Sequence, residues 1–304
     1  MNKVIKLEDY INPLELVKEL IDKGDRDSLK EARTIVYLLN KELFNNWDST
    51  LLGDKESLLN GTKVYSKEFI TNSKNNYNTI FDCVNLDCIE VARTMVESGL
   101  NPAILNLASR HEPCGGYQKG ACAQEEALSY ASTLSCSLYQ YGNPTHRHIK
   151  SSGFFKECKY PLDINFGGIY TPSARFFRDR ACNYYKISDK PFNSSIITVA
   201  SLNNHTYRFF DNEERKYFKN GTKYSKDERG FMTSEGIEIE KNKIRTILRI
   251  ALTNNHDSLV LGALGCGVYD CKIEEVSKLF ALVFEEEEFK NKFKKVTFCN
   301  TRIN

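Results

Sequence analysis

The sequence has almost no net charge and no long apolar run. Its 42 basic and 40 acidic residues leave a formal net charge of +2, which creates no general field that would draw the protein to nucleic acid or to a membrane surface. No window approaches the run of about 18 apolar residues that marks a membrane span. We therefore expect a soluble protein without sequence-specific binding to nucleic acid, in which any anionic partner is bound at a local site.

Signals for export and for zinc binding are also missing. The first twenty residues contain acidic side chains and Pro13 where a signal peptide would have its apolar core. The cysteines lack the CxxC spacing of zinc ligands, because the nearest-spaced pairs are Cys83/Cys88, Cys114/Cys122 and Cys266/Cys271. We expect an intracellular protein of the cytoplasm or the nucleus, with reduced and mostly buried thiols and with no metal or other cofactor.

The composition is that of a folded protein, with 41% hydrophobic and 27% charged residues. Apolar side chains recur at helical spacing in residues 13–23 and again in residues 27–44 behind an Asp that can cap the first turn. The polar stretch 45–63 is the predicted boundary. The sequence thus predicts a helical N-terminal extension, residues 1–63, packed on a core domain formed by residues 64–304.

Within the core, short apolar runs alternate with helical segments, which is typical of βαβ units in a mainly parallel or mixed sheet. The predicted strands are residues 79–84, 103–108, 168–170, 195–201, 258–264 and 295–300. The predicted helices are residues 87–98, 124–139, 234–252 and 273–284. The pattern predicts a three-layer α/β/α domain. Residues 203–232 have no clear periodicity and are predicted to form an exposed excursion with a short hairpin around Asn220-Gly221.

One segment combines a buried strand, a glycine turn and paired acids. Gly115 and Gly116 follow the predicted strand 103–108, and Gln124–Glu126 come after seven further residues. Glycines let the backbone approach a ligand closely, and a helix that begins near Gln124 offers free N–H groups to a phosphate or carboxylate. Since ligands bind beyond the carboxyl ends of strands in open α/β sheets, we expect a binding site here.

The adjacent acids Glu125 and Glu126 suit the cleavage of a glycosidic bond. One carboxylic acid can protonate the leaving oxygen and then deprotonate the attacking water, while the other holds sugar hydroxyls and stabilises the developing positive charge. Two acids at the start of a helix are also common as surface charges that complement the helix dipole. The glycine turn ahead of them favours the catalytic interpretation.

The pattern Gly-Gly-x7-Gln-Glu-Glu resembles the signature of poly(ADP-ribose) glycohydrolases, in which a glycine-rich loop precedes a Gln-Glu-Glu triplet. Further segments resemble the microbial-type members in the family's order, namely residues 87–99 with 105–109, residues 169–172 with 177–179, residues 261–269 and residues 296–300. The resemblance extends from about residue 33 to the end of the chain. It implies a macrodomain-like fold, ADP-ribose and poly(ADP-ribose) on modified proteins as partners, and hydrolysis of the ribose–ribose O-glycosidic bond without a metal.

The resemblance also implies roles for individual residues. Glu126 corresponds to the catalytic acid/base and Glu125 to the partner that holds the ribose hydroxyls, and both belong to the triplet that begins at Gln124. Asn106 and Ser109 would lie where the strand end meets the ribose. The remaining binding residues belong to two glycine-rich loops: Cys114, Gly115, Gly116, Gly265, Cys266, Gly267, Val268 and Tyr269, of which Tyr269 stands where the family usually has Phe.

Cys114 replaces the first of three glycines that the family's loop normally has. A side chain there is tolerable if its φ is negative but would crowd a ligand otherwise. Two other functions therefore stay open: an ADP-ribose-binding module with little turnover, and a hydrolase of mono-ADP-ribose linkages on protein or nucleic acid. In each case we expect a monomer.

Other reactive side chains receive simpler interpretations. Cys266 between two glycines could be a nucleophile, but no histidine is placed persuasively beside it, so a small residue in a glycine loop is favoured. Arg110 and His111, beside the glycine turn, are candidates for phosphate binding. Residues 146–148 are predicted to form a solvated polar loop.

Overall fold

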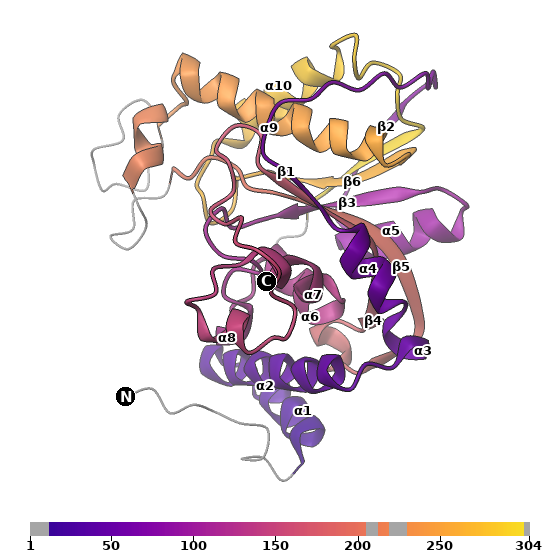
Figure 1. Ribbon diagram of the computed structural model, residues 1–304, viewed down its shortest axis with the longest axis vertical. Coiled ribbons are helices and arrows are strands. Elements are labelled where there is room, and N and C mark those ends of the chain that lie inside the picture. Colours follow the sequence, from indigo (N-terminus) through magenta and orange to yellow (C-terminus); the bar gives the residue numbers. More distant parts are fainter. Residues whose placement is uncertain (1–11, 205–211, 219–229, 301–304) are drawn as a thin grey trace. The chain divides into compact units, whose positions relative to one another are not determined.

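The computed structural model describes residues 12–204, 212–218 and 230–300 (Figure 1). They form two compact units, each assembled from several stretches of the chain. The first unit takes its described residues from Met1–Thr62, His111–Tyr160 and Thr171–Asn193, and the second from Lys63–Arg110, Pro161–Tyr170 and Ser194–Asn304. The division into an extension, residues 1–63, and a core, residues 64–304, stays a prediction.

The first unit begins with two helices that the sequence predicts well. Helix α1 comprises Pro13–Lys23 and α2 comprises Arg26–Asn45. The carboxylate of Asp25 caps α2 by accepting hydrogen bonds from the backbone N–H groups of Asp27 and Ser28, which satisfies two of the free donors at a helix start. Both predicted helices are confirmed.

The remaining helices of the first unit are short. Two of them, α3 (Ser49–Leu52) and α4 (Lys55–Gly61), lie in the polar stretch that was predicted as a boundary. Further along come α6 (Gln124–Ala131), α7 (Leu134–Leu138) and α8 (Arg147–Lys150). Three 3-10 turns complete the set: η2 (Tyr117–Lys119), η3 (Tyr139–Tyr141) and η4 (Ala181–Asn183).

The single helix predicted for residues 124–139 is wrong, because the chain breaks between α6 and α7. Ser132 is extended, with φ −141° and ψ 178°, and forms an isolated antiparallel bridge with Phe176. Its hydroxyl donates to the carbonyl of Leu128 and accepts from the N–H of Leu134. A serine side chain that bonds the local backbone in this way offers an alternative to helical pairing.

The second unit is built on a seven-stranded mixed sheet with the order β1-β4-β5-β3-β6-β7-β2. The strands are β1 (Lys63–Tyr65), β2 (Ile80–Val84), β3 (Pro102–Leu107), β4 (Gly168–Arg178), β5 (Ile187–Val199), β6 (Ser258–Gly262) and β7 (Lys295–Cys299). Strand β1 pairs antiparallel with β4, whereas β5, β3, β6, β7 and β2 are joined by parallel pairings. The carboxyl ends of β5, β3 and β6 therefore share one edge of the sheet.

The predicted strands are all present, but two of them are much longer than expected. Strands β4 and β5 both continue into segments of the first unit. The sequence underestimates β4 because Pro172 and charged residues interrupt its apolar pattern, and it misses the three-residue strand β1 altogether.

Helices cover both faces of this sheet, as predicted. Alternate residues of β3, β5 and β6 belong to one apolar cluster with α9 (Ser234–Thr253) and α10 (Ile273–Phe284), namely Ala103, Leu105, Ile197, Val199, Leu259 and Leu261. Helix α5 (Cys88–Glu97) packs against β3, β6 and β7 without joining that cluster, so it lies on the other face.

The predicted exposed excursion is wrong for its described part. Residues Asn212–Tyr217 form the 3-10 helix η5, and Glu214, Tyr217 and Phe218 are buried. Phe218 pairs with Met232 in an isolated bridge. The hairpin predicted around Asn220-Gly221 lies outside the described residues.

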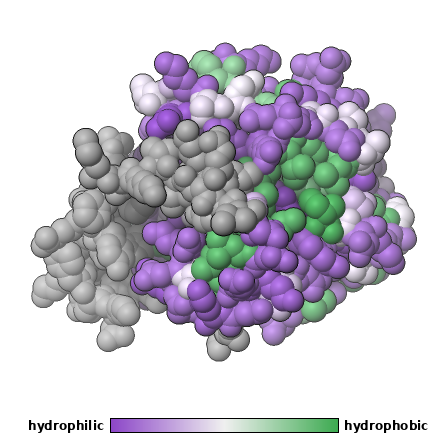
Figure 2. Space-filling model, turned by 90° about the horizontal axis from the view of Figure 1, so that it is seen from below, coloured by the Kyte–Doolittle hydropathy of each residue, from purple (hydrophilic) through white to green (hydrophobic). Residues whose placement is uncertain are grey.

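The outer surface is mostly polar on the face that Figure 2 presents, where apolar residues form limited patches. None of the helices in the described ranges is both long enough and apolar enough to cross a membrane.

Candidate active site

The glycine turn and the paired acids meet in the first unit. One oxygen of Glu126, Oε1, accepts a hydrogen bond of 2.7 Å from the N–H of Gly116. The other, Oε2, accepts one of 2.9 Å from the N–H of Ala123. Oε1 of Glu125 accepts one of 3.1 Å from the N–H of Cys114. Both carboxylates are thus fixed by the backbone of the turn that precedes them.

Gly115 lies directly against both acids. A Cβ atom at this position would come within 2.5 Å of Oε1 of Glu126 and 3.3 Å of Oε2 of Glu125. The glycine also has a φ of +50°, a conformation that side chains disfavour. The missing side chain leaves room for the two carboxylates, so the turn and the acids form a single constellation.

The position of the acids in α6 explains why they can be buried. The side chains stand in the first turn of the helix, where the free N–H groups and the helix dipole stabilise negative charge. Only 3% of Glu125 and 6% of Glu126 is exposed. The interpretation as solvated surface charge is therefore wrong.

Side chains from α2 and α6 hold the turn in place. The hydroxyl of Tyr130 donates to the carbonyl oxygens of Tyr117 and Ala121 at 2.9 and 3.0 Å. The amide of Asn40 in α2 donates to the hydroxyl of Tyr117 and to the carbonyl of Tyr130. Sequence reasoning missed these buried supports, because neither Asn40 nor the two tyrosines belongs to a motif.

Cys114 has a φ of +62°, the left-handed conformation in which its side chain was expected to crowd a ligand. The side chain is instead completely buried within the unit. Burial, together with the nearby Glu125 carboxylate, raises the pKa of the thiol well above its usual value. The expectation that this side chain crowds a ligand is therefore wrong.

The other predicted binding residues lie in the second unit, at the ends of neighbouring parallel strands. Asn106 in β3 is fully buried, and its amide donates to the hydroxyl of Thr198 at 3.2 Å. Ser109 follows the same strand. Residues 265–269 follow β6, where Val268 is exposed and the carbonyl of Tyr269 accepts a bond of 2.9 Å from the N–H of Asn204.

Cys266 and Gly265 shape this second glycine-rich loop. Burial raises the pKa of Cys266 to about 11, which weighs against a thiolate nucleophile. Gly265 has a φ of +73°, and a Cβ atom there would collide with the hydroxyl of Ser201. The tight contact requires glycine at this point.

Arg110 was a candidate for phosphate binding, but its guanidinium is already engaged. Its Nε donates to Oε1 of Glu214 at 2.6 Å and its Nη1 to the carbonyl of Leu162 at 3.1 Å. Only 12% of the arginine side chain is exposed. The guanidinium therefore makes internal hydrogen bonds within the second unit.

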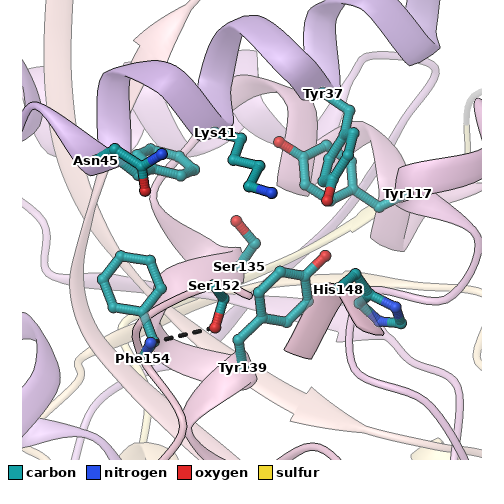
Figure 3. Close-up of a pocket in the computed structure, with 10 residues that line it drawn as sticks. Tyr37, Lys41, Asn45, Tyr117, Ser135, Tyr139, His148, Ser152 and Phe154 are labelled. Atoms are coloured by element: carbon teal, nitrogen blue, oxygen red, sulfur yellow. Dashed lines mark hydrogen bonds between the residues drawn. The ribbon is translucent and has the colours of Figure 1, made fainter. Parts of the chain in front are cut away.

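The predicted solvated loop 146–148 is wrong for His148, which lines a small pocket beside α2 (Figure 3). Burial lowers the pKa of this histidine to about 4. In Figure 3 the hydroxyl of Tyr139 and the ammonium of Lys41 point into the same gap. None of the predicted site residues lines this pocket.

In the part of the chain that the structure describes, no three His, Cys, Asp or Glu side chains gather as ligands for a metal.

Residues 32–179 match the model of a known family, described as the catalytic domain of microbial-type poly(ADP-ribose) glycohydrolase. These residues, just under half of the chain, are similar to that catalytic domain. The matched residues include the glycine turn and the triplet Gln124–Glu126.

Solved structures of bacterial poly(ADP-ribose) glycohydrolases share the fold. The enzyme from Thermomonospora curvata is 22% identical, with a TM-score of 0.64 over 88% of this chain and 93% of that one. Its structure with the inhibitor ADP-HPD gives 21% identity and a TM-score of 0.62 over the same shares. The enzyme from Deinococcus radiodurans, solved in complex with ADP-ribose, is 21% identical, with a TM-score of 0.58 over 83% of this chain and 92% of that one. Comparison with curated protein sequences gives no match.

Proposed function

We propose that this glycohydrolase domain cleaves the ribose–ribose O-glycosidic bonds of poly(ADP-ribose) and releases ADP-ribose, with Glu126 as general acid/base. The observation that carries the proposal is the burial of both carboxylates against the glycine turn, each bonded to a backbone N–H of that turn. The family match over residues 32–179 supports the substrate class.

In the proposed reaction, the carboxyl of Glu126 gives its proton to the oxygen that leaves C1 of the ribose. The C1–O bond breaks and an oxocarbenium-like cation develops. Water then attacks C1, and its proton returns to the carboxylate. Because a protonated oxygen is a poorer acceptor, we expect Glu126 to release one of its two backbone N–H bonds when it carries the proton.

Glu125 is the proposed partner that holds the ribose hydroxyls and faces the developing positive charge. Its Oε1 is occupied by the N–H of Cys114. In the proposed complex, hydroxyls of the ribose also donate to this carboxylate. Residues 265–269 supply the proposed contacts to the rest of ADP-ribose.

The test compares Glu126→Gln with Glu125→Gln on purified poly(ADP-ribose), following released ADP-ribose by chromatography. For Glu126→Gln we expect kcat to fall by about 10²–10⁴-fold, the usual contribution of a general acid/base, with little change in KM. For Glu125→Gln we expect a rise in KM as well. Equal activity of wild type and Glu126→Gln would refute the assigned role.

The Gln variant at position 126 needs a stability measurement beside it. Glutamine offers one acceptor oxygen, so the N–H of Gly116 or Ala123 would lose its partner, at a cost of about 1 kcal/mol. Thermal unfolding shows whether the variant is folded at the assay temperature. A folded, inactive variant that still binds ADP-ribose in calorimetry separates lost chemistry from lost structure.

A binding module without turnover is the alternative that Cys114 suggested. The burial of the Cys114 side chain removes the reason for this alternative. A wild type that binds ADP-ribose without any hydrolysis would support the alternative again. A panel of mono-ADP-ribosylated protein and nucleic acid distinguishes the third possibility. We also propose a monomer that acts on modified proteins inside the cell.

A further inference from the structure

Buried charged side chains hold four consecutive residues after β5. The ammonium of Lys243 donates to the carbonyl of Ala200 at 2.6 Å. The carboxylate of Glu240 accepts a bond of 2.8 Å from the hydroxyl of Ser201 and one of 3.0 Å from the N–H of Leu202.

The third charged group is Glu214. One of its oxygens accepts a bond of 2.7 Å from the N–H of Asn203, and the other accepts from Arg110, which follows β3. Each of residues 200–203 is thus hydrogen-bonded to a charged side chain. Ser201 is bonded through its hydroxyl, and the other three are bonded through the backbone.

These charges are held where charge is unfavourable. Glu240 is completely buried and 1% of Lys243 is exposed. Burial raises the pKa of Glu240 and lowers the pKa of Lys243, while the attraction between the two side chains opposes both shifts. Apolar residues of similar size often stabilise an interior as well or better. The Glu240–Lys243 pair on α9 is therefore better explained by the backbone segment that it holds in place than by a gain in stability.

The Glu240–Lys243 pair holds residues at the edge of the sheet where the parallel strands end and where we expect the ligand. Residues 200–204 follow β5, and the second glycine-rich loop follows β6, two strands that flank β3 in parallel. Ligands of open α/β sheets bind beyond such strand ends. Neither segment has regular secondary structure of its own.

The two segments are also bonded to each other. The N–H of Asn204 donates to the carbonyl of Tyr269 at 2.9 Å, and its side-chain amide to the carbonyl of Asp270 at 3.3 Å. The thiol of Cys271 donates to the carbonyl of Leu202 at 3.2 Å. A displacement of residues 200–204 would therefore move the loop 265–269.

We propose that Glu240, Lys243 and Glu214 are positioning residues that preset residues 200–204 and, through them, the loop 265–269 for ADP-ribose binding. The proposal rests on the proposed function, since ADP-ribose is the ligand to be bound. These side chains touch backbone and hydroxyl groups, and they contribute no chemistry to the bond that breaks.

The test uses Glu240→Gln in the full chain, with Glu238→Gln as the matched control. Both positions lie on α9, but Glu238 is exposed and pairs with Lys241 and Arg245 at the surface. We expect the Kd for ADP-ribose and the KM for the polymer to rise about tenfold in Glu240→Gln, the order expected when a charge-assisted hydrogen bond is lost. We expect kcat to stay within about twofold, and the control to resemble wild type.

A second variant guards against a failure to fold. Ser201→Ala removes one hydrogen bond to Glu240 but keeps both Glu240 and Lys243 in place, and we expect it to raise the same Kd by a smaller factor. A lowered Tm with unchanged Kd and KM in both variants would show a structural role only and overturn the proposal. If the wild type neither binds ADP-ribose nor hydrolyses polymer, the proposed function itself fails, which is a different outcome from an active wild type with unaffected variants.

Discussion

Substitution of Gly115 by alanine tests the close fit between the glycine turn and the two buried acids. The new Cβ atom would lie 2.5 Å from Oε1 of Glu126. The carboxylate must then move by roughly 0.9 Å to reach an ordinary contact of 3.4 Å. A shift of about 1 Å in a catalytic group can reduce the rate by about 10²-fold. We expect kcat to fall by about that factor.

The substitution also strains the backbone, and this effect has to be separated. A residue with a side chain at positive φ costs about 1–2 kcal/mol relative to glycine. Gly153 in the same unit provides the matched control, because its φ is +75° and a Cβ atom there would meet nothing within 4 Å. Gly153→Ala should lose similar stability from the backbone and retain full activity.

The assay measures ADP-ribose release and thermal unfolding for both alanine variants beside the wild type. The difference in kcat between them reports the contact with the acids, while the shared loss of Tm reports the backbone strain. If Gly115→Ala is as active as Gly153→Ala, the turn does not set the position of Glu126 and the reasoning is refuted.

Two further predictions concern buried titrating groups. In the native protein at pH 8, iodoacetamide should label the exposed Cys122 and spare Cys114, because burial raises the pKa of the Cys114 thiol. Cys114 should react only after urea unfolds the chain. Equal labelling of the two cysteines, measured by peptide mass spectrometry, would contradict the burial of the thiol. The pKa of His148 is lowered to about 4 from about 6.5 in an unfolded chain. Between these two pH values the unfolded state therefore binds more protons than the folded state. The free energy of unfolding consequently decreases as the pH falls through this range. The variant His148→Gln should show a shallower decrease in that range, and an identical pH profile of Tm would count against the assignment.

The sequence predicts the sheet and the contact between the glycine turn and the paired acids because both depend on local signals. Apolar runs mark the strands, and the acids fall next to the glycine turn in the chain as well as in space. The break at Ser132 is missed because it depends on side-chain hydrogen bonds and on a bridge to Phe176, far along the chain. The support of the turn by Asn40 is missed for the same reason, since its partner Tyr117 is 77 residues away.

The conformation of Cys114 shows which glycines the turn requires. Cys114 and Gly115 have successive φ values of +62° and +50°, so each would favour glycine on backbone grounds alone. The cysteine side chain is nevertheless accommodated, because it points into the interior, where burial of a small apolar group can offset about 1 kcal/mol of strain. At Gly115 a side chain would meet the two carboxylates instead. The space for Glu125 and Glu126, more than the backbone conformation, therefore determines where glycine cannot be replaced.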